Sequence, residues 1–487
     1  MRFMTLVKPI ILLIGCGPHA KRVYLPAIKK LEKEFDAEVV GVVELAEKEA
    51  DVKSAVTKYY PSAEFVFVDS FYHDFKKELP TEVSMRLDGF VSLHHVNCVI
   101  IATDPLNHIQ YAKWALANNL HILMDKPIST YDNVANSIDD AKNILQDYFD
   151  LIKEYNSNVA FMINAQRRFL PQFEIVQDII NDVARKYGMP ISSMQSTHSD
   201  GQWRLPDEML SIKYHPLMGW GKVSHSGYHF IDMSSKLVKD SFLAAGKTLT
   251  DVSVFTKFIK PSGLLKLQSL ADLSKLFGKK YSSEKCKSEE EYLEMFKRSN
   301  EAELDAFSII SFYIDDIAVS NITLNLMHNG FSRRSWMTPN MQDLYKGNGR
   351  LRHEYHNIEQ GPLQNIQIHS YQSNDKHDIN TESDYILGGN NHYDILIFRN
   401  SGLIGGKPLE IITAADIASA YSLDKSKVMN ELARHEAVKE FLEVVSKRRS
   451  VLSTKGNILD HSLSALLMSL IYQAGIKNQE VCQSFKA

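Results

Sequence analysis

Six residues near the start of the chain have the types and spacing of a phosphate-binding turn. The run Gly15-Cys16-Gly17-Pro18-His19-Ala20 follows the wholly apolar run Ile10 to Ile14. In this G-x-G-x-x-A pattern, the first glycine permits a tight turn and the second lets the backbone approach a pyrophosphate. The small third residue lets a helix pack closely on the strand. A helix that begins here would also offer N–H groups to the phosphates. All six are candidate cofactor-binding residues.

An acidic residue stands where the ribose of a dinucleotide would be recognised. Glu44 directly follows the apolar run Val39 to Val43. A carboxylate there accepts hydrogen bonds from the adenosine ribose and repels a 2′-phosphate, so the sequence favours NAD over NADP. The distance from Gly17 exceeds the usual ~20 residues, and a longer first helix accounts for it. The alternative is a glycine turn that binds nothing, which the strand–turn–helix context argues against.

A lysine follows a later apolar run, His121 to Met124, within the sequence Asp125-Lys126-Pro127. Ligands of open α/β sheets bind beyond the carboxyl ends of the strands, and proline disfavours a helix at Lys126. The ammonium group would there stabilise an alkoxide that forms on a substrate. The alternative is a surface lysine at a domain junction, because lysine is mostly exposed.

Two histidines, His225 and His229, are spaced to lie on one face of a helix. A histidine with a pKa near neutrality is the natural general base for a hydroxyl proton. Either side chain can instead be an ordinary core or surface residue. The same spacing also suits a pair of metal ligands, but no third ligand stands nearby in the sequence, so we predict no metal.

Alternating strand and helix patterns over residues 1–127 predict a doubly wound parallel sheet, a Rossmann dinucleotide-binding domain. The connection from Tyr59 to His95 is expected to be irregular. Strand-like runs collect beyond residue 127: Val159 to Ile163, Ile317 to Met327, Ile366 to Tyr371 and Tyr393 to Phe398. They predict an α+β domain over residues 128–487 with a mostly antiparallel open sheet and an insertion around 240–375.

In their order, these segments resemble the Gfo/Idh/MocA family, which includes glucose–fructose oxidoreductase and inositol dehydrogenase. The run from Ile101 to His108 is similar to the family segment beside the nicotinamide, and Asp125-Lys126-Pro127 to its Glu-Lys-Pro motif with Asp for Glu. The resemblance covers most of residues 8–235 and, more loosely, the tail from Lys407. It adds further cofactor-binding candidates: Thr103, Pro105, Asn107, His108, Asp125 and Lys126.

The resemblance implies an NAD-dependent dehydrogenase that acts on a hydroxyl of a sugar, sugar derivative or cyclitol. It makes Lys126 and His229 catalytic, and it places His225 where the family has an aspartate. That aspartate would raise the basicity of the histidine, whereas a charged second histidine would lower its neighbour's pKa. The departure therefore bears on substrate, direction and activity. The resemblance also implies a homo-oligomer, a dimer or a tetramer.

Four further residues are candidates for substrate binding, because arginine and aromatic groups suit polyols and carboxylates. They are Arg167, Arg168, Trp203 and Arg204. Ordinary packing is the alternative for each. Three other functions fit the same motifs: an NAD-dependent glycosidase, a non-catalytic dinucleotide-binding sensor, and a biosynthetic dehydrogenase for an amino- or nucleotide-sugar.

Composition and charge limit the classes of partner that we expect for this chain. The chain has 487 residues, 44% apolar and 23% charged, with a net charge of −4. This charge gives no reason to expect nucleic acid or an acidic membrane surface as a partner. No apolar run approaches the ~20 residues that span a bilayer, so no membrane partner is predicted. The four cysteines are scattered, which favours neither disulfides nor structural zinc and fits the cytoplasm.

Overall fold

The computed structural model describes residues 6–72, 77–201, 203–211, 215–277, 287–331, 351–373, 393–421 and 429–485. The chain forms two compact units. The first contains Met1–Thr130, Asn143–Phe173 and Lys427–Ala465, and the second contains Tyr131–Lys142, Glu174–Ser426 and Leu466–Ala487. The dinucleotide-binding fold therefore draws on chain segments beyond the boundary that we predicted at residue 127.

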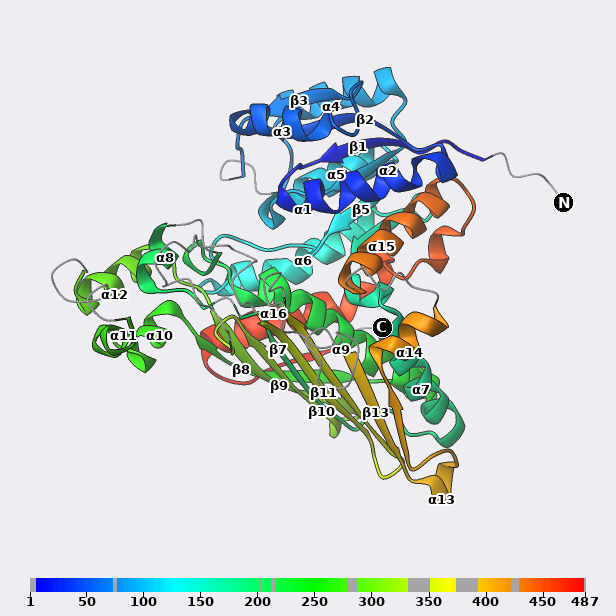
Figure 1. The fold of residues 1–487 in the computed structure, drawn as a ribbon, viewed down its shortest axis with the longest axis vertical. Helices are drawn as coiled ribbons and strands as arrows, with labels where there is room; N and C mark the ends of the chain where they lie inside the picture. The colour runs from blue at the N-terminus through cyan, green and yellow to red at the C-terminus, as the bar shows by residue number, and fades with distance from the viewer. Residues whose placement is uncertain are drawn as a thin grey trace. The chain divides into compact units, whose positions relative to one another are not determined.

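The first unit is built on a six-stranded parallel sheet (Figure 1). Its strands are β1 (Ile10–Ile14), β2 (Glu38–Leu45), β3 (Glu64–Val68), β4 (Cys98–Ile101), β5 (His121–Asp125) and β6 (Phe161–Asn164). Their order is β3-β2-β1-β4-β5-β6, with every neighbouring pair parallel. The order reverses at β1, which is the Rossmann arrangement and confirms the predicted fold class.

Two sequence-based expectations about these strands were wrong. We placed Val159 to Ile163 in the antiparallel sheet, but β6 pairs in parallel with β5 and all its residues are buried. Burial on both faces is typical of a parallel strand, and apolar composition alone does not show which sheet it joins. The stretch Tyr59 to His95 is also more regular than expected, because it contains β3 and the helix α4 (Thr81–His94).

The other helices of the first unit pack around this sheet. They are α1 (Pro18–Arg22), α2 (Tyr24–Phe35), α3 (Glu49–Val56), α5 (His108–Ala117) and α15 (Met429–Val445), and α6 (Ile138–Glu154) contributes most of its length. The helical segment after the glycine turn breaks at Val23, between α1 and α2, and Pro26 follows this break. Proline then lies in the first turn of α2, where a missing N–H costs no helical hydrogen bond.

The second unit contains a nine-stranded sheet in the order β14-β13-β12-β11-β7-β10-β9-β8-β15. Its strands are β7 (Ser193–Ser199), β8 (Asp251–Ile259), β9 (Asp305–Ile314), β10 (Ile317–Met327), β11 (Leu351–Gln360), β12 (Gln364–Ser373), β13 (Tyr393–Arg399), β14 (Leu409–Ile412) and β15 (Val481–Ser484). Only β7 and β10 pair in parallel among these described strands. The predicted mostly antiparallel sheet is confirmed. The region 240–375, which we expected to be an insertion, contains β8 to β12 and therefore forms much of the sheet itself.

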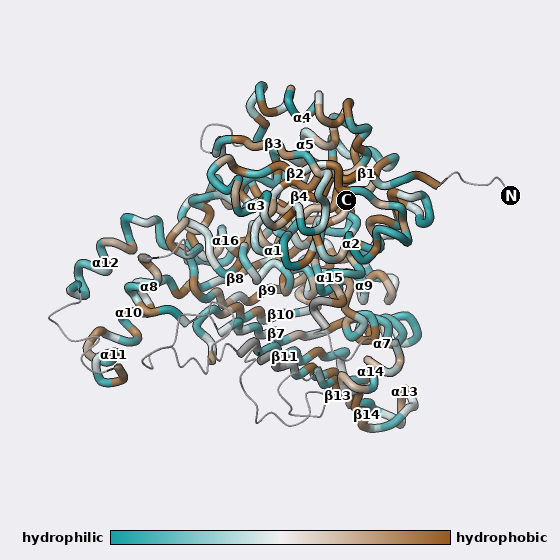
Figure 2. Tube along the Cα trace, turned by 45° about the horizontal axis from the view of Figure 1, so that its top comes forward, coloured by the Kyte–Doolittle hydropathy of each residue, from teal (hydrophilic) through white to brown (hydrophobic). Residues whose placement is uncertain are grey.

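Helices cover one face of this sheet, with α9 (Tyr228–Ala244) and α16 (Ser462–Lys477) lying against it (Figure 1). Phe230 of α9 stacks on His198 of β7, and Tyr472 of α16 packs against Phe258 of β8. Hydropathy alternates along these strands, whereas β1 and β4 are continuously hydrophobic (Figure 2). The alternation indicates one covered face and one open face.

The second unit contains further helices. They are α7 (Pro171–Tyr187), α8 (Pro206–Ser211), α10 (Pro261–Leu267), α11 (Leu270–Phe277), α12 (Glu289–Arg298), α13 (Ser401–Ile404) and α14 (Ala414–Ala420). In the part of the chain that the structure describes, no helix is both long enough and apolar enough to span a bilayer.

Candidate functional site

The glycine turn has the geometry that its pattern predicts. Gly15 has a φ of +89°, and a Cβ added there would lie 2.6 Å from the carbonyl oxygen of Ala102. Only glycine fits that position. A Cβ on Gly17 would meet no atom within 4 Å, so open space lies in front of the residue that precedes α1. This is the space that a pyrophosphate would need, and Ala20 behind it is fully buried.

Glu44 is fixed directly against this turn. Its Oε2 accepts a hydrogen bond from the backbone N–H of Cys16 at 2.7 Å, and its Oε1 accepts one from Leu45 N–H at 2.9 Å. The side chain is 7% exposed, and Lys48 Nζ lies 3.5 Å from Oε1. A carboxylate has about four acceptor sites, so capacity remains for a ribose hydroxyl. The residues present therefore fit an adenine dinucleotide.

The segment after β4 is tied to the segment after β5. Asp104 caps the short helical turn Pro105–Asn107 by accepting from Leu106 N–H at 3.1 Å. His108 is fully buried, and its Nδ1 donates to the carbonyl oxygen of Pro127 at 2.7 Å. Burial lowers the pKa of His108, so the ring stays neutral and keeps this proton. His108 thus positions the peptide beside Lys126, and its predicted contact with a cofactor stays a prediction. Thr103, Pro105 and Asn107 lie half-buried on the same segment.

Asp125 is the centre of a polar cluster beside Lys126. Tyr24 donates to Asp125 Oδ1, and Asn164 Nδ2 lies 2.6 Å from the Tyr24 hydroxyl and 3.3 Å from Asp125 Oδ1. Burial lowers the pKa of His19 to about 4; Asp125 opposes this shift and Lys126 adds to it. His19 is therefore neutral at pH 7, and Lys126 lies close enough to the glycine turn for its charge to act there. The Lys126–Pro127 peptide is cis.

The arginine pair of the short helical turn Gln166–Phe169 is buried in the first unit. Arg168 donates to the carbonyl oxygens of Lys455 at 3.1 Å and Asp460 at 3.2 Å. These bonds fasten the segment near α15 to the sheet. They give Arg168 a structural role, and substrate binding by Arg167 and Arg168 stays a prediction.

In the second unit, Trp203 packs on Phe277 with ring centroids 5.9 Å apart. With Gln268 and Asn329 it lines a surface hollow. Arg204 beside it is buried. Contact of Trp203 and Arg204 with a substrate also stays a prediction.

The two predicted histidines stand in different local structure. His225 lies in a π-helical turn, Val223–Gly227, and His229 lies in the first turn of α9. Both are half-buried. Because a π-helix bonds i to i+5, the angular relation that we assumed for an α-helix does not apply. The His225 ring instead stacks on His215, with centroids 4.6 Å apart, and lies 5.6 Å from His328.

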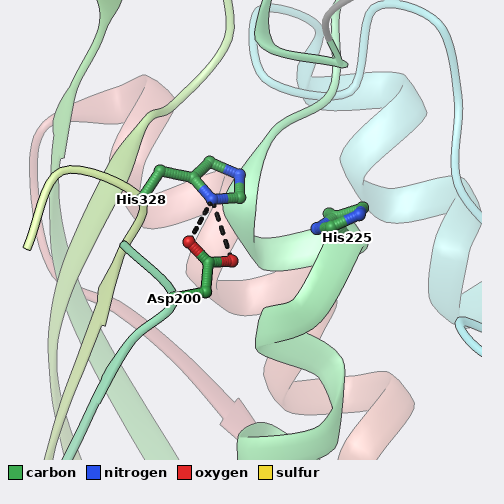
Figure 3. Close-up of side chains that lie close together, drawn as sticks. All are labelled: Asp200, His225 and His328. Carbon is green, nitrogen blue, oxygen red and sulfur yellow. Dashed lines mark hydrogen bonds and ion pairs between the residues drawn. The ribbon is translucent and has the colours of Figure 1, made fainter. Parts of the chain in front are cut away.

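Asp200 and His328 complete a cluster with His225 (Figure 3). His328 Nδ1 lies 3.0 and 3.1 Å from the two carboxylate oxygens of Asp200. The fully buried Lys222 donates to Asp200 Oδ2 at 3.0 Å, and Ser226 does so at the same distance. Sequence reasoning missed Asp200 and His328. The signal was the position of His328, directly after the predicted strand Ile317 to Met327.

A buried carboxyl group supports the π-helical turn. Glu303 Oε1 accepts from the N–H of Val223 at 2.9 Å and from the Tyr472 hydroxyl at 3.0 Å. Ser224 joins the same Tyr472 hydroxyl at 2.7 Å. Burial raises the pKa of Glu303 to about 7. Glu303 and Tyr472 thereby fix the backbone that carries His225.

Comparisons with known proteins agree with this geometry. Residues 10–148 match the model of the Gfo/Idh/MocA family, described as an oxidoreductase family with an NAD-binding Rossmann fold. No curated protein sequence matches the chain.

Similar folds occur among solved structures. A levoglucosan dehydrogenase in complex with NADH is 12% identical, with a TM-score of 0.59, over 98% of this chain and 99% of that one. Scyllo-inositol dehydrogenase from Lactobacillus casei is 14% identical, with a TM-score of 0.53 and the same coverage. The WlbA dehydrogenase from Bordetella pertussis, in complex with NADH and UDP-GlcNAcA, is 11% identical, with a TM-score of 0.53, over 99% and 100% of the two chains. At these identities the likeness shows the fold.

The glycine turn, Glu44 and the strand order are what an NAD-binding domain requires, and the family model covers the segment that contains them. Residues 10–148 match the NAD-binding Rossmann domain of the Gfo/Idh/MocA oxidoreductase family, and these residues have the strand order that such a domain requires.

Proposed function

We propose that the protein transfers a hydride between NAD and a hydroxyl-bearing carbon of a sugar, a sugar derivative or a cyclitol. The observation that carries the proposal is the glycine turn, in which open space lies before Gly17 and Glu44 is bound to Cys16. The substrate class rests on the fold. Its neighbours include enzymes named for levoglucosan and scyllo-inositol, and one in complex with a nucleotide sugar.

The residues of the first unit would hold the cofactor and polarise the substrate. The turn from Gly15 to Ala20 would receive the pyrophosphate, and Glu44 the adenosine ribose. When bound, the nicotinamide supplies the acceptor or donor of the hydride. Lys126, fixed between Asp125 and the His108-bound Pro127, would hold the reacting oxygen and stabilise its negative charge.

Proton transfer is assigned to His229 in this proposal. The ring is half-buried in the first turn of α9, and histidine is the most common general base for a hydroxyl proton. His225 has a different environment, because it lies against His215 and near Asp200 and His328. It therefore does not take over the pairing role of the family aspartate in this scheme.

The open face of the nine-stranded sheet supports a homo-oligomer as part of the proposal. Large apolar side chains on this sheet are exposed, with Ile309 of β9 at 52% and Phe398 of β13 at 39%. The strands between them carry Gln195, Thr323 and Asn357 on the same face, so this is a mixed polar and apolar surface, as many protein–protein interfaces are. A dimer or tetramer of this chain would cover it.

Calorimetric titration with NAD, NADH, NADP and NADPH tests the function first, on protein shown to carry no co-purified nucleotide. The proposal expects saturable binding of NAD or NADH and weaker binding of the phosphorylated forms. A panel of polyols, free sugars, glycosides and nucleotide sugars then tests for NADH production. Glycoside cleavage without NADH accumulation would favour the glycosidase instead. Binding of NAD without turnover of any substrate would favour a sensor. Binding of none of the four nucleotides would contradict the proposal that the protein is an NAD-dependent enzyme.

A further inference from the structure

We propose that Asp200, His225 and His328 form a binding site for a divalent transition-metal ion. One ligand atom from each of the three side chains lies within 4.8 Å of the others (Figure 3). Asp200 and His328 are buried, and His225 is half-buried. The site lies within the second unit and does not depend on the proposed dehydrogenase activity.

The sheet topology brings the first two ligands together. β7 and β10 are parallel neighbours, and Ser199 is paired in register with Met327. Asp200 and His328 are the next residues on the two strands, so they leave the sheet side by side at the same edge. Their side chains are already in contact, with His328 Nδ1 3.0 Å from Asp200 Oδ1.

The third ligand comes from the π-helical turn that precedes α9. Single π-helical turns of this kind are frequent at functional sites. Here the turn directs His225 toward the edge where β7 and β10 end (Figure 3). Gly227 closes the turn against Leu326, since a Cβ there would lie 2.7 Å from a methyl carbon of that leucine. The residue types at the turn therefore favour this close approach to β10.

Two imidazole nitrogens and one carboxylate oxygen suit zinc, iron or manganese, whereas magnesium and calcium prefer oxygen ligands alone. With metal–ligand bonds of ~2.0–2.2 Å, donor atoms around a tetrahedral ion lie roughly 3.3 Å apart. The Asp200–His328 pair meets this spacing. The ligand atom of His225 lies within 4.8 Å of the other two, so its ring must move closer to the pair when the ion binds. Three protein ligands leave at least one coordination position for water or a substrate oxygen.

Surrounding groups orient the carboxylate and the histidine. Lys222 and Ser226 both donate to Asp200 Oδ2. Asp305 Oδ1 accepts from the backbone N–H of His328 at 2.8 Å. Such hydrogen bonds around metal ligands fix their direction.

The positive charge of Lys222 opposes a cation, and the Asp305 carboxyl group, which interacts electrostatically with Lys222, partly offsets it. The three residues could also be a plain ion-pair network around the buried Lys222. In that case the Asp200 contacts with Lys222 and His328 would suffice, and His225 would contribute nothing to cation binding. Removal of His225 therefore separates a metal site from an ion-pair network.

The experiment is calorimetric titration of chelator-treated full-length protein with ZnCl₂, and with MgCl₂ for comparison. Three variants accompany the natural protein: His328→Asn, His225→Asn and the matched control His94→Asn, which removes a histidine of α4 in the first unit. Thermal unfolding of each metal-free variant reports whether it folds. His225 is half-exposed, so His225→Asn keeps the test valid even if His328→Asn is unstable.

We expect one equivalent of Zn²⁺ to bind, and no saturable binding of Mg²⁺. His225→Asn and His328→Asn should each weaken Zn²⁺ binding at least about tenfold, the scale seen when a group of a metal site is lost. His94→Asn should leave it unchanged. An absence of saturable Zn²⁺ binding, or equal affinity in His225→Asn, overturns the proposal. NAD titration of the same samples is read separately, so failure of the metal site and failure of the dehydrogenase are distinguishable.

Discussion

The carboxylate of Glu44 accepts a hydrogen bond from the backbone N–H of Cys16 at 2.7 Å, so the acid near the end of β2 is bound to the glycine turn. The residue that would recognise the ribose and the loop that would hold the phosphates are thus one rigid structure. A change at Glu44 should therefore affect both cofactor affinity and the choice between NAD and NADP.

Glu44→Ala should weaken NAD binding about 10- to 100-fold, the value of one or two lost hydrogen bonds to a charged group. The ratio of NAD affinity to NADP affinity should also fall, because the carboxylate that repels the 2′-phosphate of NADP is gone. Calorimetry with both nucleotides measures this. Glu47 is exposed and lies two residues after the end of β2, so Glu47→Ala provides the control and should bind NAD as the natural protein does. Equal NAD affinity in the Glu44 and Glu47 variants would contradict the assignment.

Substitutions of the two glycines of the turn should have different effects, one on stability and the other on NAD binding. Gly15→Ala places a Cβ against the Ala102 carbonyl at a positive φ, so the free energy of unfolding should fall by about 2 kcal/mol or more. Gly17→Ala meets no protein atom, so its unfolding free energy should change by less than about 0.5 kcal/mol while NAD binding is lost. Thermal unfolding and NAD titration together check both. Normal NAD affinity in Gly17→Ala would show that no pyrophosphate lies there.

Lys126→Ala should lower turnover about 100- to 1,000-fold, the usual effect of removing one group that stabilises a developing oxyanion. NAD affinity should change only a few-fold. The matched control is Lys113→Ala on α5, whose side chain pairs with Glu154. Steady-state kinetics with the best substrate of the panel and NAD calorimetry measure the two effects. Turnover equal to that of the control would rule out a catalytic Lys126.

His229→Gln should also lower turnover, by about 100- to 10,000-fold, because a general base contributes on that scale. Its NAD affinity should stay near normal, since the proposal gives His229 no contact with the dinucleotide. The comparison that decides the role is the pH profile of kcat/KM. If His229 is the base, the variant loses the rise toward neutral pH; an unchanged profile with reduced turnover would indicate a structural role.

Glu303 should make the stability of the protein depend on pH. Its pKa is about 7 in the folded protein, against an ordinary value of 4.5, because burial outweighs the hydrogen bonds from Val223 and Tyr472 and the attraction of Lys260. Among the described residues, none hydrogen-bonds to Oε2, where the proton would reside. The folded state therefore holds a proton that the unfolded chain releases above pH 4.5. This stabilisation is complete below pH 4.5 and is lost as the pH rises to 7.

The Glu303 contribution amounts to about 3 kcal/mol over that range, from about 1.4 kcal/mol for each pKa unit. Glu303→Gln keeps an oxygen for Val223 and Tyr472 but does not ionise. Denaturant unfolding at pH 5, 6, 7 and 8 should show a smaller loss of stability with rising pH in the variant than in the natural protein. The same pH dependence in both would mean that Glu303 is ionised when buried.

The open sheet face should control assembly. Light scattering should give a molecular mass that is a multiple of the chain's 55.4 kDa. Ile309→Glu, on that face, should shift the mass to that of one chain, because burying an unpaired carboxylate in an interface is costly. Leu93→Glu, which changes an exposed leucine of α4, serves as the control and should leave the mass unchanged. If the natural protein has the molecular mass of a single chain, the proposed homo-oligomer is wrong.

Local patterns were enough to predict the geometry of the glycine turn and the acid beside it. Gly15, Gly17 and Glu44 were proposed to bind the cofactor because of what stands next to them in sequence: a buried strand before, and a helix or strand end after. The same reasoning placed Lys126 at a strand end. Hydrophobic runs likewise predicted the parallel and antiparallel sheets. The wholly apolar run Val159 to Ile163 does not by itself show which sheet it joins, which is why β6 was assigned to the wrong sheet.

The sequence by itself determined the Rossmann fold, the NAD-type turn and the presence of two histidines four residues apart, since each depends on short-range spacing. Only the tertiary structure brought Asp200, His225 and His328 together, from positions up to 128 residues apart. Their meeting depends on the parallel register of β7 with β10 and on a π-helical turn. Strand register and a local change of helix type arise from packing against distant residues, so no spacing rule along the chain reveals them.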